Sequence, residues 1–192
     1  MKQNTSLWIL LLTGLSAGLV LGEEFSADMV RTMTGQTSSG KVYVKGDLVR
    51  METTLPMPGG KTVVILNVKS GKTIILQPAQ KMYMEMVGQK DAAAWVTKDE
   101  DYAKLGADRK LVGAEEVNGY KCRKYEVTFK NTAMGKTTQW ISEKLMFPVK
   151  IVHSGPGGEM VQELKNIKDD KVPDSLFKIP DGYTKMNVPG MP

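Results

Sequence analysis

The chain has 192 residues, of which 41% are apolar and 24% are charged, a composition typical of one globular domain and unlike that of a disordered chain or a polytopic membrane protein. Its 26 Lys and Arg against 21 Asp and Glu give a net charge of +5, too weak and too dispersed to indicate a nucleic-acid partner. The single Cys excludes an internal disulfide framework and a cysteine-based zinc site, and the single His excludes most His-ligated metal sites. We therefore expect no metal site and no cofactor.

The first segment, residues 1–22, has the features of a secretory signal peptide. Lys2 precedes an apolar stretch that runs from Leu7 to Leu21, and Gly22 is followed by acidic residues. The alternative is an uncleaved membrane anchor, because the apolar stretch approaches the length of a spanning helix. Glycines within the stretch favour cleavage, and no cysteine lies near the cleavage site to carry a lipid. We predict an exported, periplasmic protein that is not a lipoprotein.

The following residues alternate between apolar and polar with period two and are interrupted by turn residues, a pattern typical of antiparallel strands. Ser70-Gly71 and Asn118-Gly119 have the sequence of two-residue hairpin links. In chain order, the expected strands lie at residues 25–33, 41–45, 48–53, 61–69, 73–77, 81–86, 111–117, 120–130, 137–142, 148–153 and 159–167. About 10–11 antiparallel strands predict a mainly β, meander or barrel-like sheet rather than a parallel α/β fold.

One interior segment differs from this strand pattern. Residues 91–105 contain three consecutive alanines and a candidate capping box, and Gly106 follows as a candidate C-cap. We expect one or two short helices there and a further helical turn after Pro173. Residues 23–186 then form one domain, and residues 187–192, with two prolines and a glycine, form a loose tail.

The residue pairs that resemble catalytic motifs are all incomplete. Each Gly-Lys pair lacks the earlier glycine of a phosphate-binding loop and leads into a strand rather than a helix. His153 has no G-x-S-x-G nucleophile elbow to serve. Cys122 has cationic neighbours but is more simply a small buried residue on a strand. We therefore expect a protein that is not an enzyme.

The 13 methionines are the unusual feature of the composition. Met82, Met84 and Met86 alternate along one strand and therefore project from one face. Met29 and Met33 likewise share a face of the first strand. Three interpretations remain open: an ordinary core, an adaptable apolar cavity for an acyl chain, and a Cu(I) site of thioethers that lacks the usual His or Cys co-ligands.

Several short motifs resemble those of a known group of proteins. They lie at residues 46–52 (GDLVRME), 77–85 (QPAQKMYME), 138–141 (TQWI), 147–150 (FPVK) and 173–183 (PDSLFKIPDGY). With these motifs the chain resembles the exported LolA/LolB-like superfamily of lipoprotein carriers. It is more closely similar to an exported bacterial family of unknown function that shares the pattern.

The resemblance implies a curved antiparallel half-barrel of about eleven strands, whose apolar concave side is lidded by one to three short helices. Carriers of this shape hold lipoprotein acyl chains in the hollow, and an inward arginine keeps the lid shut. Arg50 and Arg31 are the candidates for that arginine. Trp95 and Tyr102 are the candidates for lid residues.

We therefore predict a periplasmic, non-enzymatic binding or carrier protein for an acyl chain, a lipid or a lipoprotein, with lysines at the rim that meet anionic headgroups. A membrane surface or an envelope protein is a further candidate partner. The alternatives are an envelope assembly protein with a filled core and a methionine-based Cu(I) protein. The candidate cavity residues are Met29, Met33, Met51, Met82, Met84, Met86 and Trp140.

Overall fold

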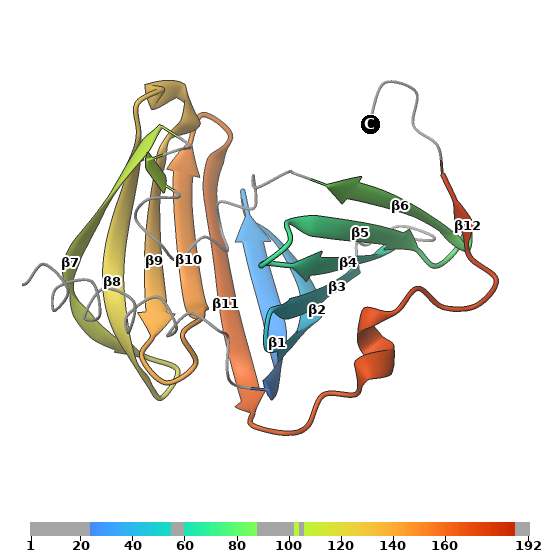
Figure 1. Cartoon of the computed structure of the whole chain (residues 1–192). Coiled ribbons are helices and arrows are strands. Elements are labelled where there is room, and N and C mark those ends of the chain that lie inside the picture. The colour runs from blue at the N-terminus through green and yellow to red at the C-terminus, as the bar shows by residue number, and fades with distance from the viewer. Residues whose placement is uncertain (1–23, 55–59, 88–101, 104–105, 187–192) are drawn as a thin grey trace, which may run out of the picture.

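The computed structural model describes residues 24–54, 60–87, 102–103 and 106–186. They form one open, curved sheet of 12 strands in the order β12-β6-β5-β4-β3-β2-β1-β11-β10-β9-β8-β7 (Figure 1). In chain order the strands are β1 (Glu24–Met33), β2 (Gln36–Lys45), β3 (Leu48–Thr54), β4 (Lys61–Asn67), β5 (Lys72–Gln77), β6 (Met82–Val87), β7 (Ala107–Val117), β8 (Tyr120–Phe129), β9 (Lys136–Ser142), β10 (Pro148–Gly155), β11 (Gly158–Lys168) and β12 (Thr184–Lys185).

Two 3-10 helices, η3 (Thr132–Met134) and η4 (Asp174–Phe177), interrupt the strands. The second begins directly after Pro173, as the sequence predicts. Of the helices expected at residues 91–105, only Tyr102 and Ala103 are described, and both are helical. The other residues of that segment, the signal peptide and the tail at 187–192 lie outside the described residues. No helix among the described residues is long and apolar enough to cross a bilayer.

The mainly β architecture is confirmed, with three differences in detail. The sheet has 12 strands because the short β12 pairs parallel with β6, where two residues give no period to recognise. β7 begins at Ala107 rather than at residue 111, since a register shift between Leu111 and Gly113 breaks the alternation. The link between β4 and β5 spans residues 68–71 and is longer than two residues.

The hairpin between β7 and β8 has the predicted two-residue link. Asn118 and Gly119 both adopt positive φ, at 51° and 81°, as a type I′ turn requires. The backbone twist of such a turn matches that of the flanking strands. The sequence pair Asn-Gly therefore fixes the register of this hairpin.

The strand register separates two faces of the sheet, which we call the Met29 face and the Arg50 face. On the Met29 face, Phe25 lies opposite Val44, and Val44 lies opposite Val49. All three are fully buried and belong to the main core cluster, which extends to Leu66 and Leu164. Burial of each such side chain contributes about 1.5–3 kcal/mol relative to exposure, so this row anchors the centre of the sheet.

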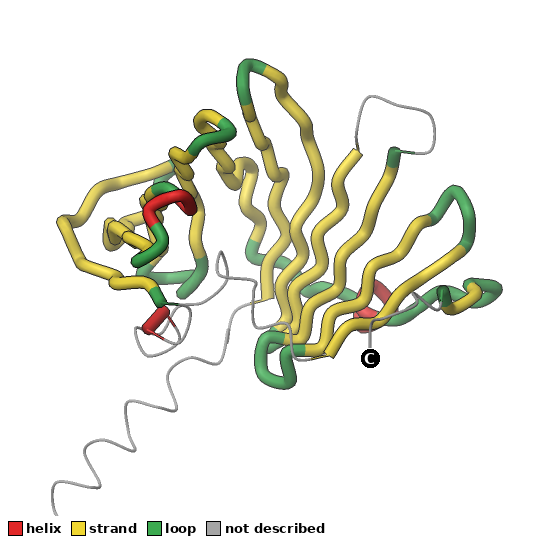
Figure 2. The backbone as a smooth tube through the Cα atoms, turned by 90° about the horizontal axis from the view of Figure 1, so that it is seen from above, coloured by secondary structure: helices red, strands yellow, loops and turns green. Residues whose placement is uncertain are grey.

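A second cluster fills the end of the sheet that holds β7–β9, which curls back on itself (Figure 2). Tyr102 packs there against Ala107, Val127 and Phe129, and all four are buried. Val127 lies opposite Thr137, which alternates with Gln139 on the Met29 face. The curl therefore holds Tyr102 against the Met29 face.

The Arg50 face of β4 and β5 is covered by the segment that follows β11. Val63, Ile65 and Leu76 are buried there beneath partly buried residues of η4 and the residues after it. The residues packed against these three are Ile74, Tyr83, Phe177, Ile179 and Tyr183. The C-terminal segment is thus the second layer over this part of the sheet.

Candidate ligand-binding site

An apolar row crosses the Met29 face from β2 to β6. Val42 lies opposite Met51, Met51 opposite Val64, Val64 opposite Ile75, and Ile75 opposite Met84. Met82 and Met86 lie two residues to either side of Met84 on β6 and therefore share its face. β-Branched and long apolar side chains at these positions favour strands.

Burial along this face decreases from the centre of the sheet to the β6 end. Val42, Val44 and Val49 are fully buried, whereas the residues at the β6 end are only partly buried. We call this partly buried set the methionine patch; it consists of Met51, Val64, Ile75, Met82, Met84 and Met86. Four of the predicted cavity methionines therefore lie on one continuous apolar surface.

Met29 and Met33 share the same face but differ from the patch in their surroundings. Met29 is 2% exposed and belongs to the main core. Its Cε would lie 3.3 Å from a Cβ at Gly40, and that Cβ would lie 1.9 Å from the carbonyl oxygen of Glu52, so only glycine fits there. Met33, at the end of β1, is 54% exposed. The structure thus places one of them in the core and the other at a sheet end.

Trp140 does not share the face of the methionines. Residues directly opposite each other in the register share a face. Trp140 on β9, Lys150 on β10, Glu163 on β11 and Val30 on β1 form one such row, and Val30 is on the Arg50 face. The ammonium groups of Lys124 and Lys150 lie 4.9 Å and 5.2 Å from the Trp140 ring centroid. Its Nε1 donates to Glu115 at 2.9 Å. The register thus turns Trp140 to the other face, although it is buried and belongs to the same core cluster as Met29. Alternation within one strand does not reveal this.

Buried glutamines on the Met29 face hold two of the residues that the sequence singles out. Arg31 donates to Gln162 Oε1 through Nη2 at 2.7 Å and Nε at 3.2 Å. The Tyr102 hydroxyl donates to Gln139 Oε1 at 2.8 Å. Ile151 lies between the two glutamines in the register, so Arg31 and Tyr102 are held in one cross-strand row. Trp95 lies outside the described residues.

Arg50 lies on the opposite face and binds the C-terminal segment. Its Nη1 donates to the carbonyl oxygen of Leu176 in η4 at 2.7 Å, and Nη2 pairs with Glu52 at 2.7 Å. Lys61 pairs with the other Glu52 oxygen at 2.9 Å. Desolvation alone raises the pKa of Glu52, but its hydrogen bonds and charge interactions with Lys61 and Arg50 outweigh that effect and lower the pKa. Of the two arginine candidates, Arg31 therefore shares the methionine face and Arg50 fastens η4.

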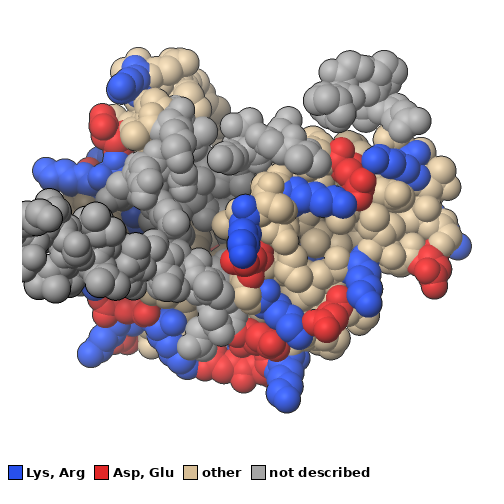
Figure 3. Space-filling view, viewed as in Figure 1, with Lys and Arg blue, Asp and Glu red and all other residues tan. Residues whose placement is uncertain are grey.

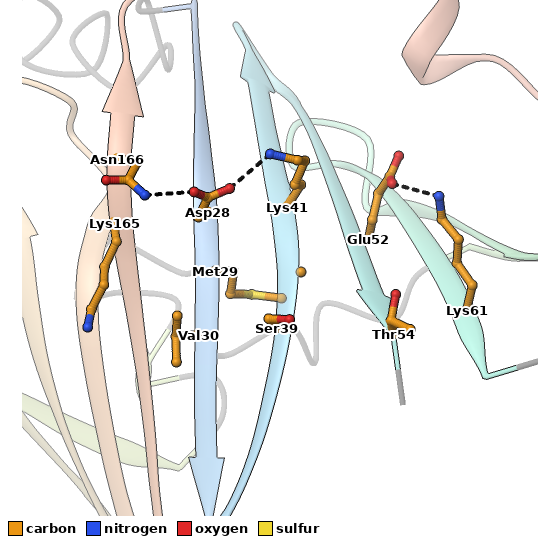
Figure 4. Close-up of a pocket in the computed structure, with 11 residues that line it drawn as sticks. Asp28, Met29, Val30, Ser39, Lys41, Glu52, Thr54, Lys61, Lys165 and Asn166 are labelled. Atoms are coloured by element: carbon orange, nitrogen blue, oxygen red, sulfur yellow. Dashed lines mark hydrogen bonds and ion pairs between the residues drawn. The ribbon is translucent and has the colours of Figure 1, made fainter. Parts of the chain in front are cut away.

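A polar groove of about 520 Å³ lies across β11, β1, β2, β3 and β4. Asp28 lies between Asn166, which donates to it at 2.8 Å, and Lys41, which pairs with it at 2.9 Å (Figure 4). These bonds, Asn166 first and then Lys41, lower the pKa of Asp28. Opposite charges also alternate over the face drawn in Figure 3, so the described surface in that view presents no broad field of one sign.

The structure places the residues that the sequence offers as metal ligands or nucleophiles. No cluster of three or more His, Cys, Asp or Glu residues among them is arranged to hold a metal ion. Cys122 is 1% exposed, and burial raises the pKa of its thiol to about 11, which leaves it protonated and unreactive. His153 bonds to Thr137 Oγ1 through Nδ1 at 3.0 Å.

Sequence reasoning missed the buried glutamines and the apolar residues of the C-terminal segment. Gln139 and Gln162 occupy core-facing positions of the period-two pattern, and a polar residue at such a position is the signal that marks them. Phe177, Ile179 and Tyr183 pack on Val63 and its neighbours. The signal for this contact is that residues 63–66 and 74–76 are apolar without alternation. Such stretches indicate strands that are apolar on both faces.

The sequence matches a family model described as a domain of unknown function (DUF4412) over residues 26–146 and 135–183. The chain belongs to this family. The sequence-based resemblance to a family of unknown function is thereby confirmed. No curated protein sequence matches the chain.

Several solved structures are similar to this DUF4412 protein at low sequence identity. An uncharacterized conserved protein from Thermus thermophilus has a TM-score of 0.62 at 11% identity, over 93% of this chain and 98% of that chain. MucB has a TM-score of 0.55 at 17% identity, and the match covers 92% of this chain but only 64% of MucB. MucB is also solved in complex with MucA(peri). A LolA superfamily protein from Nitrosomonas europaea matches with a TM-score of 0.40 at 11% identity, over 81% of this chain and 90% of that one.

Proposed function

We propose that this DUF4412 protein is an exported, non-enzymatic binding protein that holds an acyl chain or a similar apolar ligand against the methionine patch. The observation that carries the proposal is the two-sided apolar character of β4 and β5. Their Arg50 face is buried beneath the C-terminal segment, whereas Val64 and Ile75 on the other face are only partly buried. An apolar surface of this extent at a sheet end favours a ligand or partner over water.

The side chains of the patch suit an adaptable ligand. Thioethers are flexible and polarizable, so Met82, Met84 and Met86 can rearrange around chains of different shape. Each methylene that leaves water contributes about 0.8 kcal/mol, so no nucleotide energy is needed for loading.

The test compares two variants of the full chain in binding of a fluorescent fatty acid. Replacing Met82, Met84 and Met86 with Gln keeps their length but adds polar groups, and we expect affinity to fall at least about tenfold, since the lost apolar transfer exceeds about 1.4 kcal/mol. Met146→Gln, at an exposed site in the β9–β10 hairpin, is the matched control and binds normally. Equal binding by both variants, or ligand-free protein in native mass spectra of envelope extracts with no probe uptake, contradicts the proposal.

A second candidate is that the protein binds another envelope protein, as MucB does in its complex with MucA(peri). The observation that favours it is the edge strand β7, where Leu111 and Val112 are 53% and 42% exposed. An exposed edge strand accepts an extended peptide by adding a strand to the sheet. Leu111→Lys is expected to abolish such a complex in analytical ultracentrifugation while fatty-acid binding is retained. Loss of both activities would indicate misfolding and would count against this assignment.

A further inference from the structure

The only histidine of the chain lies next to methionines at one end of the Met29 face. His153 on β10 lies directly opposite Met160 on β11, and Met160 lies directly opposite Met33 on β1. Directly opposed side chains have Cβ atoms about 4.5–5.5 Å apart. An imidazole and two thioethers therefore occupy neighbouring positions on three adjacent strands, although they are far apart in sequence.

A third methionine reaches the same end of the sheet through η3. Ser154 on β10 pairs with Lys136, the first residue of β9, and only Gly135 separates Lys136 from η3. The carbonyl oxygen of Met134 would lie 3.7 Å from a Cβ at Gly155, and the Cα of Gly135 would lie 3.8 Å from it. The last residue of η3 is thus beside the strand that carries His153.

One nitrogen of the His153 ring is held by a hydrogen bond, and the other lies beside Gly155. Nδ1 lies 3.0 Å from Thr137 Oγ1; when Nδ1–H donates this bond, Nε2 keeps its lone pair for a metal. A Cβ at Gly155 would lie 3.0 Å from Nε2. A side chain at position 155 would therefore crowd Nε2, and the backbone of Met134 and Gly135 lies close to the same point.

The methionines at this end are not explained by core packing. Met33 is 54% exposed and Met134 is 47% exposed, whereas Met29, which precedes Met33 on the same face of β1, is buried. Exposed thioethers around the only imidazole form a soft donor set. Such a set prefers Cu(I) to the harder divalent cations, for which the described residues offer no carboxylate, His and Cys cluster.

The geometry points to a Cu(I) site at this end of the sheet, formed by His153 Nε2 and thioethers of Met160, Met33 and Met134. Thr137 is a positioning residue, because it fixes the ring through Nδ1. The site lies on β1, β11 and β10, at least five positions in the strand order from β6, which carries Met82, Met84 and Met86. It is therefore independent of the methionine patch and of the function proposed for that patch.

The experiment titrates the full chain with Cu(I) under anaerobic conditions against a chromophoric chelator. We expect one Cu(I) per chain. Met160→Leu, which conserves volume in the sheet, is expected to weaken the affinity at least about tenfold, because loss even of an outer-shell partner costs about 10–100-fold. Thr137→Val is expected to weaken the Cu(I) affinity by about tenfold, because it removes the outer-shell hydrogen bond that orients the His153 ring. The matched control, in which Met82, Met84 and Met86 become Leu, retains full affinity.

A spectroscopic readout identifies the ligands directly. Ag(I), an air-stable cation of the same softness, is expected to shift the ¹³C-methyl signals of Met33, Met134 and Met160 and the ring signals of His153, and to leave those of Met84 in place. No Cu(I) retained against the chelator overturns the inference. Loss of binding in the β6 control variant, or shifts confined to β6, also overturns it, and neither result bears on fatty-acid binding at the patch.

Discussion

The two ends of the Met29 face differ in how their side chains are held. Over β9, β10, β11 and β1, the buried Gln139 and Gln162 each accept a hydrogen bond at 2.7–2.8 Å from a residue that the sequence singles out, Tyr102 or Arg31. Over β3–β6, the partly buried methionine patch contains no hydrogen-bonding side chain. One end is therefore fixed by directional bonds, and the other is held only by adaptable apolar contacts.

This contrast indicates a division of labour within one sheet. Hydrogen bonds between buried groups specify a single geometry, because an unpaired partner in the interior is costly. Thioethers tolerate rearrangement with little cost. The proposed function, a binding protein with a conformationally defined frame and a compliant ligand surface, needs both properties, and they lie on the same face.

The largest expected effect separates two methionines of identical chemistry. Met29→Ala removes a side chain that is 2% exposed and is expected to lower the free energy of unfolding by about 2–5 kcal/mol, since a cavity remains in the core. Met84→Ala at the partly buried patch is expected to cost about 1 kcal/mol or less. Urea denaturation of both variants measures the difference. Equal losses would show that the patch is as tightly packed as the core.

The next prediction tests the hydrogen-bonded part of the Met29 face, over β9, β10, β11 and β1. Tyr102→Phe leaves the ring in place but removes the donor to Gln139 Oε1, an acceptor on a residue that is 1% exposed. The expected loss of unfolding free energy is about 1–3 kcal/mol, because a buried acceptor loses its partner. Tyr183→Phe, on a partly buried tyrosine over the Arg50 face, is the control with a smaller loss. A neutral Tyr102→Phe variant would mean that Gln139 finds another donor.

The strands and turns could largely be predicted from the sequence, but the grouping of residues at the candidate site could be predicted only in part. Alternation and the Asn118-Gly119 turn predict the antiparallel sheet, because both are local properties of the chain. The shared face of Met82, Met84 and Met86 also follows from local alternation. The side of the sheet on which Trp140 lies depends on the register of four strands, and the proximity of His153 to Met160 depends on the β10–β11 pairing. Those are long-range properties that spacing within one strand does not contain.

A smaller effect concerns the fastening of η4 to the Arg50 face. The pKa of Glu52 is lowered in the folded protein, so its contribution to stability is fully present above the unfolded value of about 4.3 and is lost as the pH falls through the lower folded value. Partial exposure limits the contribution to about 1 kcal/mol. Chemical denaturation at a series of pH values from about 6 down to about 3, which brackets the unfolded value, is expected to show this loss.

Glu52→Gln supplies the control for that pH dependence. The variant cannot form the ion pairs with Arg50 and Lys61, so it is expected to be less stable near neutral pH and to show a flatter decline in acid. Proteolysis of the C-terminal segment after η4 gives a second readout, because Arg50 then holds Leu176 without its carboxylate partner. An unchanged acid profile in Glu52→Gln would assign the decline to other carboxylates.

The last prediction compares a buried thiol of the core with a thiol on the methionine patch by their rates of chemical reaction. Cys122 is buried with a pKa of about 11, so at pH 8 only about one part in a thousand is thiolate, and that fraction is out of reach of a reagent. A thiol placed at position 84 by Met84→Cys lies on the partly buried patch and is expected to react at least about tenfold faster with a disulfide reagent. Urea well below the unfolding midpoint should accelerate Cys122 only if β8 opens locally. A Cys122 that reacts as fast as the position-84 thiol would mean that the core around β8 opens as readily as the patch, and the distinction between a tightly packed core and a compliant surface would fail.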